Sequence, residues 1–430
     1  MDTSTSEIIE LHPKRKLQGV ITVPADKSVS HRSIMCASLA KGESVVYNFL
    51  TGEDCISTAQ CFKNLGVDIK FENDRVYIKS EGLRQFDGVL NVNNSGTTMR
   101  MLTGILASQN MTSQIDGDQS IQNRPLKRVT EPLKLMGANF EFLNKDGFCP
   151  VKVFGTKLNG IRYKMPILSA QVKSAILFAG LSANSNSEVI EISKTRDHTE
   201  RMLKLFGAKI NVSENKITIT PSVLKPQNLT VPGDISSAAF FIAASLITKD
   251  SLLKIENVGI NPTRGSVIDI FRRMGGDINI ENYKDGFEPT CDLIVKSSKL
   301  KGVEICGEEA AIAIDELPII AAVATQCEGT TAIKNAGELK VKESNRIDTV
   351  FSELTKCGAD IKKQDDGFII SGKTQIKPAN FFSYNDHRIA MTCAVLSLIA
   401  DGFCTLQNYK CVNVSYPGFF DTLQNLGEKA

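Results

Sequence analysis

The sequence predicts an α/β protein made of six similar units, and two recurring patterns support this prediction. In the first, the end of an amphipathic helix is followed by a glycine and then by a strand with alternating apolar residues, as in "FKNLGVDI" and "LKLFGAKI". A glycine directly after a helix commonly adopts the left-handed conformation that ends the helix. The pattern recurs at intervals of 68 to 83 residues, with its glycines at Gly66, Gly137, Gly207, Gly275, Gly358 and Gly427.

The second pattern begins about 40 residues before each glycine, where a polar turn precedes a helix rich in small and apolar residues. The segment "GDISSAAFFIAASLI" (233–247) is an example. A helix that is apolar nearly all round is buried, so we expect each of these helices to pack against a sheet. A period near 70 residues exceeds a solenoid turn and favours one small βα-type subdomain per unit. The longest interval predicts an insertion of about a dozen residues in the fifth unit.

Helix capping does not explain every charge in the six polar turns. Ser, Asp and Asn are preferred N-cap residues, and capping alone accounts for "GDISS". Cations at a helix N-terminus oppose the helix dipole, so their presence there indicates that an external anion binds between them. The cations concerned are Lys27, Arg32, Arg100, His387 and Arg388.

The composition indicates a globular protein without a nucleic-acid or membrane partner. The 430 residues are 42% hydrophobic and 23% charged, and 50 Lys and Arg residues nearly balance 48 Asp and Glu residues. A near-neutral chain lacks the basic surface that binds nucleic acid or membranes. Eleven cysteines without a C-x-x-C pair favour a reduced, cytoplasmic protein, and "MDTSTSEIIELHPKRK" contains no secretory signal.

Eight motifs, in order along nearly the whole chain, resemble those of the 5-enolpyruvylshikimate-3-phosphate synthase family. They are "DKSVSHR" (26–32), "NSGTTMR" (94–100), "GDQSIQNRP" (117–125), "SAQVKSAILFAGL" (169–181), "TRDHTERM" (195–202), "DELP" (315–318), "LKVKESNRI" (339–347) and "NDHRIAM" (385–391). The resemblance implies a two-domain inside-out α/β barrel. Each domain would have three βαβαββ-type repeats, with the helices inside, the sheets outside and the active site in the interdomain cleft.

The same resemblance implies the domain boundaries. One domain would span residues 22–232, and the other would combine 1–21 with 233–430. Three of the six repeat glycines fall in each, which supports the division independently.

The resemblance also implies the reaction. The family transfers the carboxyvinyl group of phosphoenolpyruvate to the 5-hydroxyl group of shikimate 3-phosphate and releases phosphate, through a tetrahedral intermediate, as a step of aromatic amino acid biosynthesis. This chemistry needs a base for the hydroxyl group and an acid that protonates the methylene carbon. It requires no metal and no organic cofactor, and the four histidines have no metal-ligand spacing. We expect a monomer that binds these two small molecules.

The resemblance assigns a role to each matching residue. Asp315 would accept the hydroxyl proton, Glu343 would be the general acid, and Lys27 and Lys342 would take part in proton transfer. The residues implied to bind shikimate 3-phosphate are Lys27, Ser28, Arg32, Ser169, Ala170, Gln171, Arg196, Asp315 and Lys342. The residues implied to bind phosphoenolpyruvate are Lys27, Asn94, Gly96, Arg124, Gln171, Arg346, His387 and Arg388.

Residue spacing adds three local predictions. Lys342 and Arg346 are four residues apart, which predicts two cations on one helix face that need a counter-anion. Ser28 and Arg32 have the same spacing, so both should face one ligand. Asp315, which begins "DELP", is also predicted to cap a helix.

The chain departs from the family pattern at two places. Many members have a lysine that contacts phosphoenolpyruvate where this chain has Val414, and Lys410 lies four residues upstream. "SAQ" (169–171) replaces the "SSQ" of many members, which removes one hydroxyl group.

One alternative is the related enolpyruvyl transferase that acts on UDP-N-acetylglucosamine. That enzyme typically has a Lys-Asn dipeptide and a loop cysteine, whereas here Lys27 precedes a serine and no cysteine lies between Cys61 and Cys149. A second alternative, a non-catalytic phosphate-binding module, would not need an acid–base set such as Asp315 and Glu343. A NAD-dependent dehydrogenase is disfavoured because no G-x-G-x-x-G follows a predicted strand.

Overall fold

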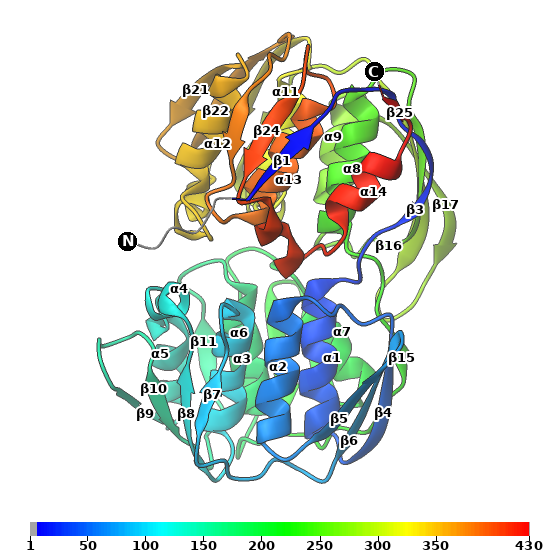
Figure 1. Ribbon diagram of the computed structural model, residues 1–430. Coiled ribbons are helices and arrows are strands. Elements are labelled where there is room, and N and C mark those ends of the chain that lie inside the picture. The colour runs from blue at the N-terminus through cyan, green and yellow to red at the C-terminus, as the bar shows by residue number, and fades with distance from the viewer. Residues whose placement is uncertain (1–6, 430) are drawn as a thin grey trace. The chain divides into compact units, whose positions relative to one another are not determined.

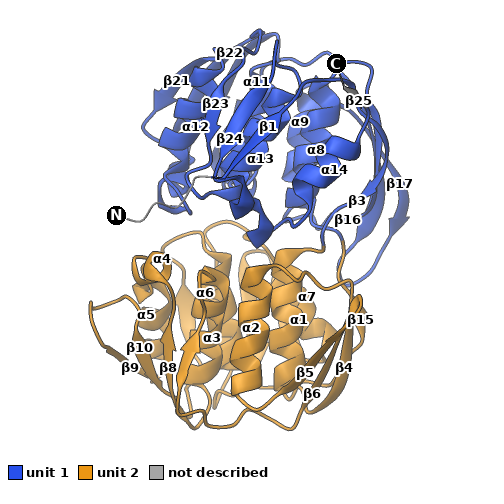
Figure 2. Ribbon diagram, in the orientation of Figure 1, with its two compact units in different colours: residues 1–24, 233–430 blue, residues 25–232 orange. Residues whose placement is uncertain are grey.

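The computed structural model describes residues 7–429, and the chain divides into two compact units. Unit 2 comprises residues 25–232, and unit 1 combines residues 1–24 with 233–430 (Figure 2). Residues 22–24 fall in unit 1 and not with 25–232, because Thr22 pairs with Glu256. As folding domains, 22–232 and 1–21 with 233–430 stay a prediction.

Unit 2 contains three four-stranded sheets of one design. The first, in the order β15-β4-β6-β5, contains β4 (Gly42–Tyr47), β5 (Asp68–Glu72), β6 (Arg75–Ser80) and β15 (Leu229–Thr230). The second, in the order β7-β8-β10-β9, contains β7 (Val89–Asn91), β8 (Thr112–Asp116), β9 (Asn139–Phe142) and β10 (Val151–Phe154). The third, in the order β11-β12-β14-β13, contains β11 (Arg162–Lys164), β12 (Ser187–Ile190), β13 (Lys209–Ser213) and β14 (Lys216–Thr220). In each sheet the first pair is parallel and the other two pairs are antiparallel.

The helices of unit 2 lie between its sheets (Figure 1). They are α1 (Lys27–Leu39), α2 (Glu53–Asn64), α3 (Gly96–Ala107), α4 (Gln119–Gln122), α5 (Lys127–Leu135), α6 (Ala170–Gly180) and α7 (His198–Leu205). Helices α3 and α6 approach closely at Gly104, where an added β-carbon would lie 2.4 Å from the Ala175 carbonyl oxygen. Only glycine fits this crossing without moving a helix.

Unit 1 repeats the design with one incomplete copy. The order β17-β18-β16-β3 contains β3 (Gln18–Thr22), β16 (Leu252–Gly259), β17 (Asp277–Lys284) and β18 (Thr290–Lys296). The order β19-β20-β22-β21 contains β19 (Glu304–Ile305), β20 (Gly329–Ile333), β21 (Asp360–Gln364) and β22 (Gly367–Gly372). The incomplete sheet, β1-β24-β23, contains β1 (Ile8–Leu11), β23 (Asn380–Phe382) and β24 (Cys404–Gln407). Strand β2 (Lys14–Lys16) pairs with β25 (Glu428–Lys429).

The helices of unit 1 also lie inside its sheets (Figure 1). They are α8 (Ile235–Ile247), α9 (Ser266–Arg273), α10 (Gly307–Ile312), α11 (Leu317–Ala324), α12 (Arg346–Lys356), α13 (His387–Ser397), α14 (Phe419–Asn425) and the 3₁₀ helices η1 (Gly337–Val341) and η2 (Tyr409–Val414). Every residue of α11 is buried, and so is every residue of α8 except Ile247. The expectation that these small-residue helices form the cores is confirmed.

The repeat predicted from the glycines is confirmed. All six have φ between 72° and 99°. Each glycine directly follows the C-cap residue of a helix and precedes a strand. The interval of 83 residues, between Gly275 and Gly358, contains α10 and η1.

The polar turns cap five of the six buried helices through a side chain. The capping residues, each accepting a hydrogen bond from a backbone N–H of the first turn, are Asp26, Ser95, Ser169, Asp234 and Asp386. The capping prediction for Asp315 is wrong. Helix α11 begins at Leu317 with Glu316 in the cap position, so Asp315 lies outside the helix and its carboxylate is available for other partners.

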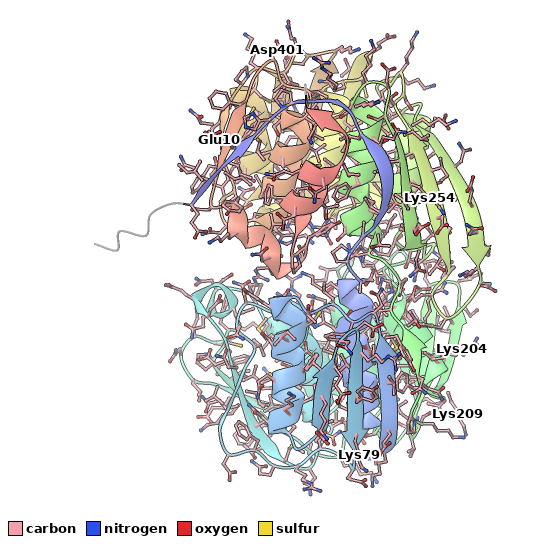
Figure 3. All side chains as sticks on the ribbon, turned by 45° about the vertical axis from the view of Figure 1, so that its right-hand side comes forward. Glu10, Lys79, Lys204, Lys209, Lys254 and Asp401 are labelled. Carbon is pink, nitrogen blue, oxygen red and sulfur yellow. The ribbon has the colours of Figure 1, made fainter. Side chains whose placement is uncertain are left out.

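Nine of the eleven cysteines are buried as free thiols, and burial raises the pKa of the Cys61 thiol to about 12. Charged side chains lie on the outer faces of the sheets, and Figure 3 shows Lys79 of β6 and Lys254 of β16 pointing away from the ribbon. Among the described residues, no helix combines the length and apolar character that crossing a membrane requires.

Candidate active site

The first polar turn, at the N-terminus of α1, holds Lys27 beside a carboxylate. Asp26 Oδ1 accepts a hydrogen bond from Val29 N (2.9 Å), so the helix begins with Lys27 and Ser28. The Lys27 ammonium group lies 3.1 Å from Asp54 Oδ2 of α2 and is partly exposed. The cation is therefore oriented at a helix N-terminus and can still contact an anionic ligand.

The second polar turn, at the N-terminus of α3, brings Asn94, Gly96 and Arg124 together. Arg124 Nη2 donates a hydrogen bond to Asn94 Oδ1 (3.2 Å). A β-carbon at Gly96 would lie 3.0 Å from Arg124 Nη1 and 3.2 Å from Arg100 Nη1. Two guanidinium groups thus flank backbone N–H groups at the start of a helix, an arrangement suited to an anion.

Arg100 is one of the cations that indicated a bound anion, but the family resemblance assigned it to neither substrate. Its Nη1 donates a hydrogen bond to Gln171 Oε1 (2.6 Å), and Gln171 Nε2 donates to Thr97 Oγ1 (3.1 Å). These bonds connect the N-terminal turns of α3 and α6. The available signal was the position of Arg100 four residues after Gly96, on the same face of α3.

Arg32 is buried and bonded to the protein. Its guanidinium group donates hydrogen bonds to Ser28 O (2.9 Å), Thr199 Oγ1 (2.6 Å) and Ser174 Oγ (3.3 Å). Burial, with a smaller contribution from the charge of Arg196, lowers the pKa of Arg32 to about 10. Arg32 therefore connects α1 with α6 and α7, and lies close to Arg196.

Ser169 Oγ caps α6 by accepting a hydrogen bond from Val172 N (3.4 Å). Ala170 and Gln171 consequently occupy the first turn, where backbone N–H groups have no partner within the helix. These groups can contact a phosphate without the hydroxyl group that "SAQ" lacks. Arg196 lies on the segment just before α7.

His31 has a packing role. It is fully buried on α1, and its Nδ1 forms a hydrogen bond with Thr58 Oγ1 (2.6 Å). Burial lowers the pKa of His31 from 6.5 to about 3. The imidazole is therefore neutral at pH 7 and takes no part in proton transfer there.

This burial predicts a loss of stability in acid. Between pH 6.5 and 3, the unfolded chain binds a proton at His31 that the folded chain does not, so the free energy of unfolding falls as the pH falls. Over the range from pH 7 to 5 the loss at this residue is about 2 kcal/mol. His31→Asn, which retains a polar group for Thr58, should lose correspondingly less. Urea denaturation of both proteins at pH 7 and 5 measures this, and equal losses would contradict it.

In unit 1, Arg346 is the centre of a cluster of carboxylates. Its side chain is only 1% exposed and contacts Asp386 Oδ2 (2.8 Å), Glu343 Oε2 (2.7 Å) and Asp315 Oδ1 (3.4 Å). Burial opposes the charge, but the carboxylates of Asp386 and Glu343 outweigh it and raise the pKa of Arg346. The guanidinium group thus holds the predicted base and the predicted acid close together.

Lys342 and Arg346 do not lie on one helix face, so that prediction is wrong. Helix α12 begins at Arg346, because Asn345 Oδ1 caps it by accepting a hydrogen bond from Ile347 N (3.2 Å). Lys342 follows η1 in an extended conformation, and its ammonium group lies 3.0 Å from Asp315 Oδ1. The counter-anion that the two cations needed is Asp315, which both contact through the same oxygen.

His387 and Arg388 begin α13, which is capped by Asp386. Arg388 Nη1 donates a hydrogen bond to the Asp315 carbonyl oxygen (2.8 Å) and lies 3.3 Å from Glu316 Oε1. The sixth polar turn therefore contacts the same segment as Lys342 and Arg346.

Arg264 is a second residue that the sequence did not reveal. Glu316 is buried, and its Oε1 accepts a hydrogen bond from Ser236 Oγ, which in turn accepts one from Arg264 Nη2. Asp234 caps α8, as the "GDISS" interpretation predicted. The turn is also bonded to a cation, Arg264, which lies 28 residues after Ser236. No local pattern indicates that contact.

The segment where many family members have a lysine forms a 3₁₀ helix in this protein. Val414 is the last residue of η2, and Lys410 forms an ion pair with Glu7. Among residues 7–429, no group of three or more His, Cys, Asp or Glu side chains is arranged to hold a metal ion. The clustered carboxylates of unit 1 pair with Lys342, Arg346 and Arg388 instead.

Comparison with known proteins places these residues in a family. A family model described as EPSP synthase (3-phosphoshikimate 1-carboxyvinyltransferase) matches residues 11–423. Over 422 residues, the chain is 50% identical to a protein named 3-phosphoshikimate 1-carboxyvinyltransferase from Thermoanaerobacter sp. (strain X514), covering 97% of this chain and 100% of that protein.

Comparison with solved structures supports the same family. An EPSP synthase from Acinetobacter baumannii matches with a TM-score of 0.90 and 40% identity over 99% of both chains. The enolpyruvyl transferase NikO from Streptomyces tendae shares the fold, with a TM-score of 0.79 and 15% identity over 99% of this chain and 98% of that one. The predicted two-domain inside-out α/β fold is confirmed, and the chain belongs to the EPSP synthase (3-phosphoshikimate 1-carboxyvinyltransferase) family.

Proposed function

We propose that this protein transfers the carboxyvinyl group of phosphoenolpyruvate to the 5-hydroxyl group of shikimate 3-phosphate, giving 5-enolpyruvylshikimate 3-phosphate and phosphate. One observation carries the proposal beyond family membership. Asp315 and Glu343, a candidate base and a candidate acid, both contact the buried guanidinium group of Arg346. The reaction needs this combination of two proton-transferring groups and a fixed cation.

Phosphoenolpyruvate would be bound by guanidinium groups from both units. Arg124, with Asn94 and Gly96, would contribute from unit 2, and Arg346 and Arg388 from unit 1. A guanidinium group can donate two parallel hydrogen bonds to a carboxylate or phosphate, which fixes the orientation of the ligand as well as its position. Gln171, His387 and Lys27 would complete this set.

Shikimate 3-phosphate would be bound mainly by the first turns of α1 and α6. Ser28, Ser169, Ala170 and Gln171 would contact it there, where the helix N-termini favour an anion. Lys27, Arg32 and Arg196 would supply positive charge. Since Arg32 already bonds to three protein groups, its contribution would be electrostatic and structural.

Proton transfer would involve Asp315 and Glu343. Asp315 would accept the proton of the 5-hydroxyl group as its oxygen attacks C2 of phosphoenolpyruvate, while Glu343 would give a proton to C3. Negative charge brought by the substrate favours the protonated form of Glu343. In the second step C3 returns a proton and phosphate leaves with one, which restores both groups. Lys342, 3.0 Å from Asp315, would stabilise its charged form.

The remaining expectations are proposals of the same kind. We propose that the protein acts in the cytoplasm as a monomer, without nucleic-acid or membrane partners and without a cofactor. The acidic and basic side chains proposed above for substrate binding and proton transfer would suffice for the chemistry described.

The test is phosphate release. With shikimate 3-phosphate and phosphoenolpyruvate together, the purified protein should release phosphate, and with either substrate alone it should not. No release with both would overturn the proposal. Release with UDP-N-acetylglucosamine in place of shikimate 3-phosphate would favour the alternative transferase.

A further inference from the structure

A buried cluster of three charges in unit 2 has no part in the proposed chemistry. Lys173 of α6 is 1% exposed, and its ammonium group lies 3.1 Å from Glu191 Oε1 and 2.6 Å from Glu200 Oε1. Both carboxylates are buried as well, and burial raises the pKa of Glu200. The cluster contains one cation and two carboxylates.

Stability alone does not account for such a cluster. Removing ions from water costs several kcal/mol each, and apolar side chains of similar size often stabilise a core as well or better. The other buried residues of α6 are small or apolar, with Lys173 and Ser174 as the polar exceptions. Apolar packing therefore does not explain the presence of Lys173 and Ser174 in this helix.

The cluster holds the residue before Arg196. Glu191 Oε1 accepts hydrogen bonds from Thr195 N (3.1 Å) and Thr195 Oγ1 (2.5 Å). Lys173 Nζ donates one to the Thr195 carbonyl oxygen (3.4 Å). All three polar groups of Thr195 are thus bound to the cluster, which fixes the backbone from which Arg196 extends.

Thr199, which follows Arg196, is held by α6, the helix that contains Lys173. Thr199 Oγ1 lies 2.6 Å from Ser174 Oγ and accepts a hydrogen bond from Arg32 Nε (2.6 Å). Ser174 Oγ also donates to the Ala170 carbonyl oxygen (2.6 Å). Lys173 and Ser174 are adjacent in α6, and they therefore bind the two ends of the segment 195–199.

We propose that Lys173 is a positioning residue for shikimate 3-phosphate. It fixes the segment that carries Arg196 against the first turn of α6, so that Arg196 and the Ala170–Gln171 backbone present one site to the phosphate. Because the phosphate is remote from the reacting hydroxyl group, its contacts are equal in the ground and transition states. Loss of such contacts raises KM and leaves kcat unchanged. This inference rests on the proposed function.

The test compares the double variant Lys173→Met/Glu200→Gln with the wild type. The double variant removes one charge of each sign, so the cluster keeps its net charge and the chain is not left with two unbalanced carboxylates. Displacement of Arg196 should raise the KM and the calorimetric Kd for shikimate 3-phosphate about tenfold or more. At saturating shikimate 3-phosphate, the KM for phosphoenolpyruvate should stay within about twofold of the wild-type value. The value of kcat should stay within about threefold.

The matched control is Glu200→Gln alone, which keeps Lys173 and Glu191 in contact with Thr195. It should bind shikimate 3-phosphate within about threefold of the wild type. Wild-type affinity in the double variant would overturn the proposal, and so would equal losses for both substrates and kcat, which indicate a general structural role. A wild type that binds shikimate 3-phosphate but releases no phosphate contradicts the proposed function and not the role of Lys173.

Discussion

Replacement of Arg346 by methionine is expected to lower kcat/KM about 10³-fold, since it removes a contact to phosphoenolpyruvate and the group that orients both Asp315 and Glu343. It should also lower the free energy of unfolding by about 3–5 kcal/mol. The reason is that Asp386 is fully buried and would keep its charge without the guanidinium group that now contacts both of its oxygens. Phosphate-release kinetics and urea denaturation measure the two effects.

Two further variants separate charge from geometry. Arg346→Lys retains the charge but cannot contact Asp386, Glu343 and Asp315 at once, so it should restore part of the stability and little of the activity. The control Arg273→Met removes an exposed arginine of the same unit, which pairs with Glu309 at 2.8 Å. Surface pairs of this kind contribute at most about 1 kcal/mol. An Arg346→Met protein with wild-type stability and activity within tenfold would contradict the assigned role.

The repeat could be predicted from the sequence because its signals are local. Glycine is the favoured residue where the backbone takes a positive φ after a helix, and all six predicted positions do so. The buried helices were recognisable for a similar reason, since burial on all sides leaves an apolar sequence such as that of α8. Neither feature depends on contacts with distant segments.

The helix start at Arg346 shows where local reasoning fails. Spacing suggested that Lys342 and Arg346 share a helix face, but α12 begins at Arg346, four residues later than a helix that includes Lys342 would. The two cations then meet at Asp315, which is 31 residues before Arg346. Spacing within one motif contains no information about a contact with another.

Buried ions within apolar helices are hidden for the same reason. Lys173 lies inside a quoted motif, and Arg264 lies outside all of them, yet both are buried against carboxylates from other segments. A single lysine in an apolar helix looks the same whether it is exposed or paired. Only the fold shows that Glu191 and Glu200 lie beside it.

Replacement of Asp315 by asparagine is expected to lower kcat about 10²–10⁴-fold while leaving the fold intact, because it removes the proposed base and keeps its shape. The Asp315 carbonyl oxygen, which binds Arg388, is unchanged by the substitution. Arg346 retains Glu343 and Asp386 as partners, so the melting temperature should change little. Single-turnover phosphate release at saturating substrates measures the chemical step directly.

A matched control distinguishes the loss of a base from the loss of an ion pair. Asp348→Asn removes a carboxylate of α12 that pairs with the exposed Lys363 at 2.8 Å, and it should release phosphate at the wild-type rate. If Asp315→Asn also kept a rate within tenfold of the wild type, Asp315 would not be the base. Glu343→Gln would then be the informative variant, since Glu343 is the other carboxylate with a proposed proton-transfer role and contacts Arg346 at 2.7 Å. Slow release by both variants is the expected result, because addition and elimination each need a group that gives a proton and a group that accepts one.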